Sequence, residues 1–147
     1  MFTKPGESGL EILQTQDDEV LASEDGEIKF SVRVFNPGVM KVQFRAGFIC
    51  PAGFDLVSVE TKDSDHTARK SVFSPDHPVV PVRLDGERML HLADKDFVVW
   101  SRQSEQFRLA FRREKPFAPG EVLAFTVRVL IGEENQMQEK LFSFTFD

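Results

Sequence analysis

The sequence predicts an all-β fold: an immunoglobulin-like β-sandwich of two antiparallel sheets with seven to nine strands. Three observations support this prediction. Apolar and polar residues alternate in short segments along most of the chain, turns containing proline and glycine separate these segments, and phenylalanine and valine fill many apolar positions. Alternation with a period of two is typical of strands that bury one face. Short strands at this spacing favour a sandwich or barrel over βαβ units.

The N-terminal half contains a series of predicted strands. Leu10 to Leu13 supplies the first, and every second residue is apolar from Ile28 to Val34. That strand ends at Asn36-Pro37-Gly38, where proline presets φ at one corner of a turn and glycine accepts a positive φ at the next. The chain then reverses into an alternating segment from Lys41 to Phe48, and an extended apolar run follows from Phe54 to Val59. Together these segments predict two or three consecutive antiparallel strands.

The middle of the chain is less regular. Thr61 to Ala68 is polar and is expected to form a loop. Val79 to Leu84 predicts a strand, and Pro81 within it indicates an edge or a bulge, because proline cannot donate a hydrogen bond to a sheet. Asp85-Gly86 suits a tight turn. Arg88 to Leu92 then fits the second arm of a hairpin, whereas Glu87 to Lys95 also fits a short helix, and we favour the strand.

Alternation returns in the C-terminal third, over Phe107 to Arg112, Val122 to Leu130 and Phe142 to Phe146. An Ala118-Pro119-Gly120 turn separates the first two segments, and the polar stretch from Gly132 to Gln138 is expected to be a loop. The chain shows no internal repeat and no linker-like composition. We therefore predict a single immunoglobulin-like domain over residues 1–147.

Composition and charge narrow the classes of function. The net charge of −6 argues against attraction of the whole protein to nucleic acid or to an anionic membrane. The lone cysteine, Cys50, cannot form an internal disulfide, which fits a reducing compartment or a bacterial surface domain stabilised by packing. The N-terminal residues lack the apolar stretch of a signal peptide, and no segment is long enough to span a bilayer. We expect a cell-surface or extracellular location if the sequence is excised from a longer secreted chain, and a cytoplasmic one otherwise.

Two stretches carry a resemblance to known families. Ser31 to Val59 contains a strand, the Asn-Pro-Gly turn, a second strand and then Cys-Pro-Ala-Gly-Phe, and Phe117 to Val129 contains Ala-Pro-Gly-Glu before an alternating strand. Both resemble the bacterial and archaeal surface Ig-like repeat modules of the DUF11, CARDB and NEW3 type. Phe54 to Glu60 is similar to cohesin domains. These resemblances imply binding or spacer roles at cell surfaces or in extracellular assemblies, without catalytic residues.

Residues suited to catalysis are sparse. A nucleophile requires a neighbouring base that an acid positions, and the three histidines are His66, His77 and His91. His66 lies in a polar stretch, His77 lies between prolines, and His91 lies in a strand-like segment. Cys50 has no neighbouring positive charge or helix start that would lower its pKa. We therefore predict that the chain is not an enzyme.

Carboxylates gather in segments that are expected to be loops. Asp63 to His66, Asp17 to Glu19 and Glu24-Asp25 place oxygen ligands close together, and calcium accepts oxygen ligands from irregular loops. Their spacing lacks the glycine and the distal bidentate acid of an EF-hand loop, and acidic loops are commonly only solvated. No glycine-rich phosphate loop is present. Calcium binding stays an open alternative, and we assign no metal site and no cofactor.

Cations, in contrast, occupy the outward positions of the clear strands. An immunoglobulin-type topology is expected to place four arginines side by side in one sheet, as a basic face on an acidic molecule. Such a face could bind an acidic peptide, an acidic glycan or the acidic loops of a neighbouring copy. The alternative is that long cationic side chains cover the sheet and discourage edge-to-edge pairing. The candidate binding residues are Arg45, Arg108, Arg112 and Arg128.

The sequence thus favours a non-enzymatic interaction or structural module, as part of a larger surface, adhesive or appendage assembly. Its expected partner is a protein or a neighbouring subunit, with an acidic glycan as a further candidate and with no nucleic acid and no membrane insertion. The alternative is a carbohydrate-binding or cohesin-like module attached to an enzyme system. Sugar-binding modules stack aromatic rings on their ligand, and the absence of Tyr leaves only Trp100 for that role.

Overall fold

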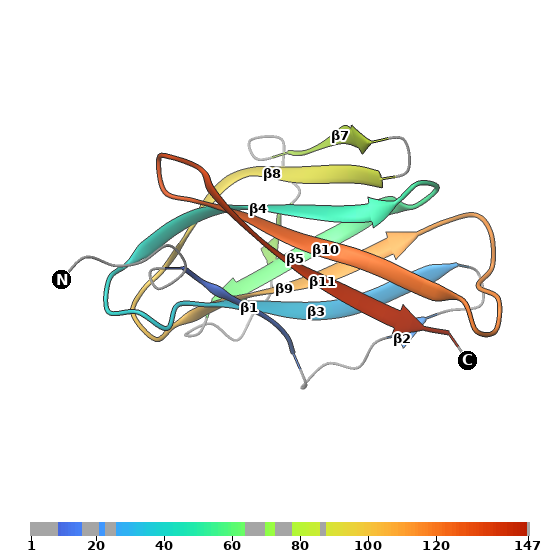
Figure 1. Cartoon of the computed structure of the whole chain (residues 1–147), viewed down its shortest axis with the longest axis horizontal. Coiled ribbons are helices and arrows are strands. Elements are labelled where there is room, and N and C mark those ends of the chain that lie inside the picture. The colour runs from blue at the N-terminus through green and yellow to red at the C-terminus, as the bar shows by residue number, and fades with distance from the viewer. Residues whose placement is uncertain are drawn as a thin grey trace.

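The computed structural model describes residues 9–15, 21–22, 26–63, 70–72, 78–85 and 88–146. Within them the chain forms two antiparallel β-sheets, which build a sandwich (Figure 1). The prediction of an all-β, immunoglobulin-like sandwich is confirmed, and the nine described strands of four residues or more agree with the predicted number. The strands are β1 (Glu11–Gln14), β2 (Leu21–Ala22), β3 (Glu27–Phe35), β4 (Val42–Pro51), β5 (Asp55–Asp63), β6 (Lys70–Ser71), β7 (Val79–Asp85), β8 (Arg88–Val99), β9 (Ser104–Arg112), β10 (Val122–Ile131) and β11 (Gln136–Thr145).

Each sheet combines strands that are distant in the sequence. One sheet has the order β1-β3-β9-β5-β6, with β2 also paired to β3, and we refer to it as the β9 sheet. The other has the order β11-β10-β4-β8-β7, and we refer to it as the β10 sheet. Strands that follow each other along the chain therefore often lie in different sheets, as β3, β4 and β5 do (Figure 1). This alternation between layers is typical of immunoglobulin-like sandwiches.

The Asn36-Pro37-Gly38 turn connects the two sheets and does not close a hairpin. The positive φ that was predicted for its glycine is wrong, because Gly38 is not one of the glycines with positive φ. The side chain of Asn36 holds the turn instead, since its Oδ1 accepts a hydrogen bond of 3.0 Å from the amide of Gly38. An Asx turn of this kind needs no left-handed residue.

The structure settles the ambiguous middle of the chain. Strand β8 covers the described part of the segment from Glu87 to Lys95, so the favoured strand is confirmed and the short helix is wrong. Strand β7 lies at the edge of the β10 sheet, as Pro81 predicted. Two segments that were expected to be loops are partly strand, because β5 continues to Asp63 and β11 already begins at Gln136.

Phenylalanine side chains dominate the core between the sheets. Phe30 and Phe111 of the β9 sheet stack with 6.1 Å between their ring centroids. Phe125 of the β10 sheet lies 5.4 Å from the first ring and 4.7 Å from the second. All three side chains are at most 1% exposed. Stacked and tilted ring pairs at these distances are favourable and need no hydrogen-bond partner, so this cluster joins the two layers.

Candidate functional site

The four arginines that were predicted to form one basic face lie on the outer surfaces of two different sheets. Arg108 and Arg112 belong to β9, whereas Arg45 belongs to β4 and Arg128 to β10. The single basic face is therefore wrong. Alternation along a strand shows which residues point outward, but it does not show which sheet receives the strand. The binding role of the four residues stays a prediction.

Each of these arginines already has a partner. Nη2 of Arg45 donates a hydrogen bond of 3.0 Å to Oδ1 of Asn135, and Nη2 of Arg128 lies 3.2 Å from Oε2 of Glu139. Arg108 and Arg112 are not free either. Arg45 also borders an open depression of about 440 Å³ that is lined by both cations and carboxylates. The charged residues that line it are Arg45, Lys95, Asp94, Asp96 and Glu133.

The outer face of the β10 sheet carries a row of apolar side chains. Val82 lies opposite Leu90, and Leu90 lies opposite Ile49. On the other side of Ile49, the row continues through Thr126 to Leu141. Residues directly opposite each other share one face of a sheet, so this row crosses all five strands, with Thr126 as its one polar member. The neighbouring row adds two more apolar residues. We define the apolar stripe as Ile49, Val80, Val82, Leu90, Leu92 and Leu141.

The apolar stripe is buried at its centre and exposed at its two ends. Ile49 is 1% exposed, whereas Val82 is 47% and Leu141 is 59% exposed. Gly47 on the same face allows the close packing at the centre, because a Cβ there would lie 2.9 Å from Cδ1 of Leu90. The solvated face of an antiparallel sheet usually carries polar side chains. A mainly apolar row on such a face marks a candidate interaction surface.

Cys50 and His91 approach each other inside the sandwich without forming a nucleophilic pair. Sγ of Cys50 lies 4.0 Å from Nδ1 of His91, and the thiol donates to the carbonyl of Phe54 at 3.6 Å. Burial, together with the carboxylate of Asp55, raises the pKa of Cys50 to about 12. Burial also lowers the pKa of His91. Because only the thiolate is a nucleophile, this environment suppresses the reactivity of the cysteine.

The predicted acidic clusters fall almost entirely outside the described residues. Asp63 ends β5, but the rest of that cluster with His66, the cluster from Asp17 to Glu19, Glu24-Asp25 and also His77 are not described. Within the described ranges, no group of three His, Cys, Asp or Glu side chains is placed to hold a metal ion. The same ranges contain no helix that could span a bilayer.

A second apolar surface lies at one end of the sandwich, on the loops that connect β3 to β4 and β8 to β9. Val39 is 87% exposed, Met40 is 74% exposed and Trp100 is 58% exposed. We refer to these three residues as the loop tip. Both loops lie at the left-hand end of the sandwich in Figure 1. Nζ of Lys41 lies 5.0 Å from the centroid of the Trp100 ring, so side chains of the two loops are in contact.

Asn36 locks these two loops together. Its Nδ2 donates hydrogen bonds to the carbonyl of Met40 at 2.7 Å and to the carbonyl of Val99 at 3.0 Å. Oγ of Ser101 donates a further bond of 2.7 Å to the carbonyl of Gly38. Asn36 is 1% exposed, and buried hydrogen-bonded networks of this kind fix one conformation. The loop tip is therefore held in place before any partner binds.

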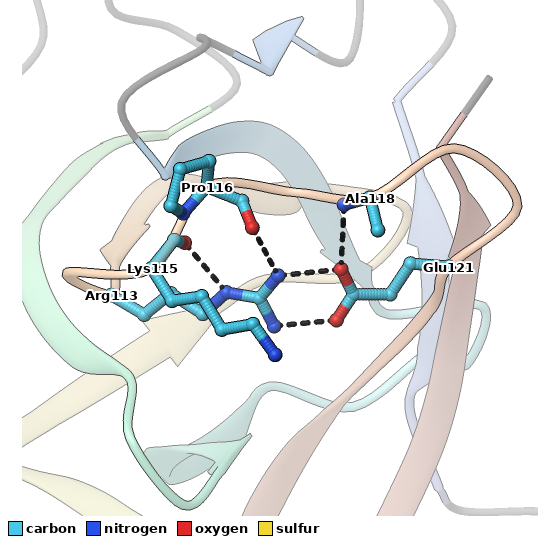
Figure 2. A network of polar contacts seen from close by, with 5 residues as sticks. All are labelled: Arg113, Lys115, Pro116, Ala118 and Glu121. Carbon is cyan, nitrogen blue, oxygen red and sulfur yellow. Dashed lines mark hydrogen bonds and ion pairs between the residues drawn. The ribbon is translucent and has the colours of Figure 1, made fainter.

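Arg113 organises the opposite end of the sandwich, in the loop between β9 and β10 (Figure 2). Its guanidinium forms a bidentate ion pair with Glu121 and donates to the carbonyls of Lys115 and Pro116 at 2.9 Å and 3.0 Å. Glu121 accepts a further bond of 3.0 Å from the amide of Ala118. These polar groups therefore find their hydrogen-bond partners within the loop itself, so we interpret the network as a structural clamp.

Comparison with known proteins supports the fold and leaves the family open. No protein-family model matches the chain, and no curated protein matches its sequence. The DUF11, CARDB and NEW3 resemblance therefore stays a prediction at the level of the family. The immunoglobulin-like class itself is shared with pilin domains of known structure.

Three solved structures illustrate the shared fold. AvmM, described as catalysing macrocyclization in alchivemycin A biosynthesis, has a TM-score of 0.58 at 9% identity, over 95% of this chain and 89% of that one. Domains D2 and D3 of the major pilin SpaD from Corynebacterium diphtheriae give 0.53 at 15% identity, over 92% of this chain and 51% of that one. The major pilin subunit BcpA of Bacillus cereus has a TM-score of 0.54 at 6% identity, over 93% of this chain and 40% of that one. The chain thus spans about half or less of these pilins, and identities this low show the fold alone.

Sequence reasoning missed both apolar surfaces. Val39 and Met40 fall between a turn and a strand, where no periodic pattern exists, and Trp100 drew attention only as a residue that could stack on a sugar. The signal for the stripe was present, because Val80, Val82 and Leu141 occupy outward positions that polar residues usually take. It could not be used without knowing that β7, β8, β4, β10 and β11 form one sheet.

Proposed function

We propose that this chain is a non-enzymatic interaction module of a larger surface, adhesive or appendage assembly, and that the apolar stripe contacts a neighbouring subunit. The observation that carries the proposal is the row across the outer face of the β10 sheet, to which four of the five strands contribute an apolar side chain and β10 contributes Thr126. Contact with a subunit would remove its exposed ends, Val80, Val82 and Leu141, from water. Burial of such side chains provides the main driving force of most protein association.

The chemistry of the described residues agrees with a role in binding. The thiol of Cys50 has a pKa raised to about 12 and lies inside the sandwich, so it offers no nucleophile at neutral pH. The shared fold by itself does not decide the function, because AvmM is described as catalysing a macrocyclization whereas SpaD and BcpA are major pilins. The stripe favours a structural role over catalysis, because it offers a surface for contact and contains no reactive group.

Photo-crosslinking of the purified chain tests this contact. A benzophenone amino acid replaces Val82 in one variant and Val57, which is 44% exposed on the β9 sheet, in a matched control. We expect covalent dimers from position 82, with crosslinks that map by mass spectrometry to stripe residues of the second copy. Equal dimer yields from positions 82 and 57, or crosslinks only within one copy, would contradict the proposal.

A further inference from the structure

We propose that the loop tip, formed by Val39, Met40 and Trp100, docks on a lipid surface with anionic headgroups. The proposal does not rest on the apolar stripe, which lies on a different surface of the sandwich. The sequence predicted no membrane insertion. The proposal departs from that prediction only for these three side chains, which enter the interfacial layer while the sandwich stays in water.

The three side chains of the loop tip are exposed to solvent, and none of them lines the depression beside Arg45. Val39 and Met40 are adjacent in the chain and are 87% and 74% exposed, at the turn between two strands. Projecting apolar side chains can reach the boundary between headgroups and acyl chains, whereas protein domains bind peptides in grooves or along sheet edges. A specific protein interface also buries about 800 Å² on each partner, and three side chains supply only part of such an area. The shape therefore favours a lipid surface over a protein.

The charges around the loop tip are mainly positive. The two loops contain Lys41 and Arg102 and no carboxylate, although the chain has a net charge of −6. Arg33 adds a third cation, because its guanidinium and that of Arg102 lie 5.5 Å and 5.6 Å from the centroid of the Phe35 ring. Two carboxylates lie nearby, that of Glu11 opposite Phe35 and that of the buried Glu105 opposite Val34, and the hydroxyl of Thr61 donates a hydrogen bond to the second. Basic residues beside an apolar tip gain from the negative surface potential of anionic lipids.

Trp100 and Lys41 form a pair that suits the membrane interface. The indole is 58% exposed, and the ammonium lies 5.0 Å from its centroid. Indole rings favour the level of the headgroups. A lysine can lay its stem along an apolar surface while its ammonium stays among the headgroup phosphates. Both side chains can therefore keep these positions when Val39 and Met40 enter the acyl boundary.

The lock formed by Asn36 reduces the entropic cost of docking. Its side-chain amide bonds the carbonyls of Met40 and Val99, so the two loops are already fixed side by side. A binding surface that is ordered in advance loses little conformational freedom when it binds.

The lone tryptophan makes the test direct. Emission of Trp100 is recorded while the chain is titrated with vesicles of phosphatidylcholine alone, or of phosphatidylcholine mixed with phosphatidylglycerol, at low and high salt. We expect a blue shift with the anionic vesicles, a weaker shift in high salt, and quenching by lipids brominated along the acyl chain. An unshifted spectrum with anionic vesicles overturns the proposal. An equal shift with neutral vesicles overturns the requirement for anionic headgroups.

Two variants assign the binding to the loop tip. Val39→Ser with Met40→Ser keeps the reporter and the Met40 carbonyl that Asn36 binds, and we expect at least about tenfold weaker vesicle binding. Lys41→Gln with Arg102→Asn removes the two loop cations, and asparagine tolerates the φ of 64° at position 102. We expect this variant to lose the preference for anionic vesicles.

Val122→Ser is the matched control, because Val122 is 63% exposed at the start of β10, away from both loops. Its binding should equal that of the wild type. The proposal fails if the Val39 and Met40 variant binds as the wild type does, or if the control loses as much binding as that variant. Circular dichroism of each variant shows that the sandwich is intact.

Discussion

The guanidinium of Arg113 meets the carboxylate of Glu121 through two nitrogen–oxygen contacts of 2.5 Å. The same guanidinium lies 5.3 Å from the ring centroid of Phe54 and 4.9 Å from that of Phe117. Arg113 therefore connects the loop between β9 and β10 to aromatic side chains at the end of the core. Cation–π contacts of this geometry add to the attraction between the two charges.

Stability should depend on pH through this pair. The hydrogen bonds from Arg113 hold the pKa of Glu121 at about 2, below its ordinary value of 4.5. A carboxylate with a lowered pKa in the folded state stabilises the fold above its ordinary pKa, and this contribution is lost as the pH falls toward the folded value. We expect the difference in unfolding free energy between the wild type and Glu121→Gln to be largest above pH 4.5 and to shrink toward pH 2. Urea denaturation over that range measures it, and a constant difference would argue against the clamp.

Cys50 should resist alkylation in the native protein. Its pKa is raised to about 12, and the side chain is fully buried, so almost no thiolate is present at pH 8. We expect iodoacetamide to leave the folded chain unmodified and to modify the chain completely in denaturant, as measured by mass spectrometry. Rapid modification of the folded chain would show that the thiol is accessible and ionised.

Replacing Asn36 should loosen the loop tip. Asn36→Asp keeps an acceptor for the amide of Gly38 but removes the donor that bonds the carbonyls of Met40 and Val99. Unsatisfied buried acceptors cost about 1–3 kcal/mol, so we expect a loss of stability in that range. Hydrogen exchange should accelerate in both loops and remain slow in β9 and β10. Unchanged stability and exchange would mean that the side chain does not lock the loops.

The arginines should act as two separate pairs. Arg45 and Arg128 share the sheet that carries the apolar stripe, whereas Arg108 and Arg112 lie on the other sheet. If arginines support the subunit contact, Arg45→Gln with Arg128→Gln should weaken crosslinking from position 82. Arg108→Gln with Arg112→Gln should leave it unchanged. Equal effects of both double variants would disagree with this assignment.

The strands with regular alternation could be predicted from the sequence, because their inward residues meet one core. In β9, Phe107, Leu109 and Phe111 alternate with polar or small residues and are all at most 1% exposed. Strand β8 was ambiguous for a physical reason. Its register against β4 shifts between the pairs Gly47–Leu92 and Arg45–Asp96, and this irregularity interrupts the period of two.

The candidate surfaces could not be predicted, because they depend on the pairing of distant strands. Val82 and Leu141 are far apart in the chain and share one row only because β4, β8 and β10 lie between their strands. The incorrect prediction of a single basic face has the same cause, because the sequence does not show which sheet each arginine-bearing strand joins. Asn36 was recognised as part of a turn, but the bond from its side chain to Val99 links loops that the sequence does not show to be neighbours.

Sedimentation velocity over a concentration series tests the proposed subunit contact most directly. Three chains are compared: the wild type, Val82→Glu with Leu141→Glu, and the matched control Val57→Glu on the β9 sheet. We predict association that grows with concentration for the wild type and the control, and a monomer at every concentration for the double variant. Identical sedimentation of the wild type and the double variant at all concentrations would contradict the proposal that the apolar stripe binds a neighbouring subunit.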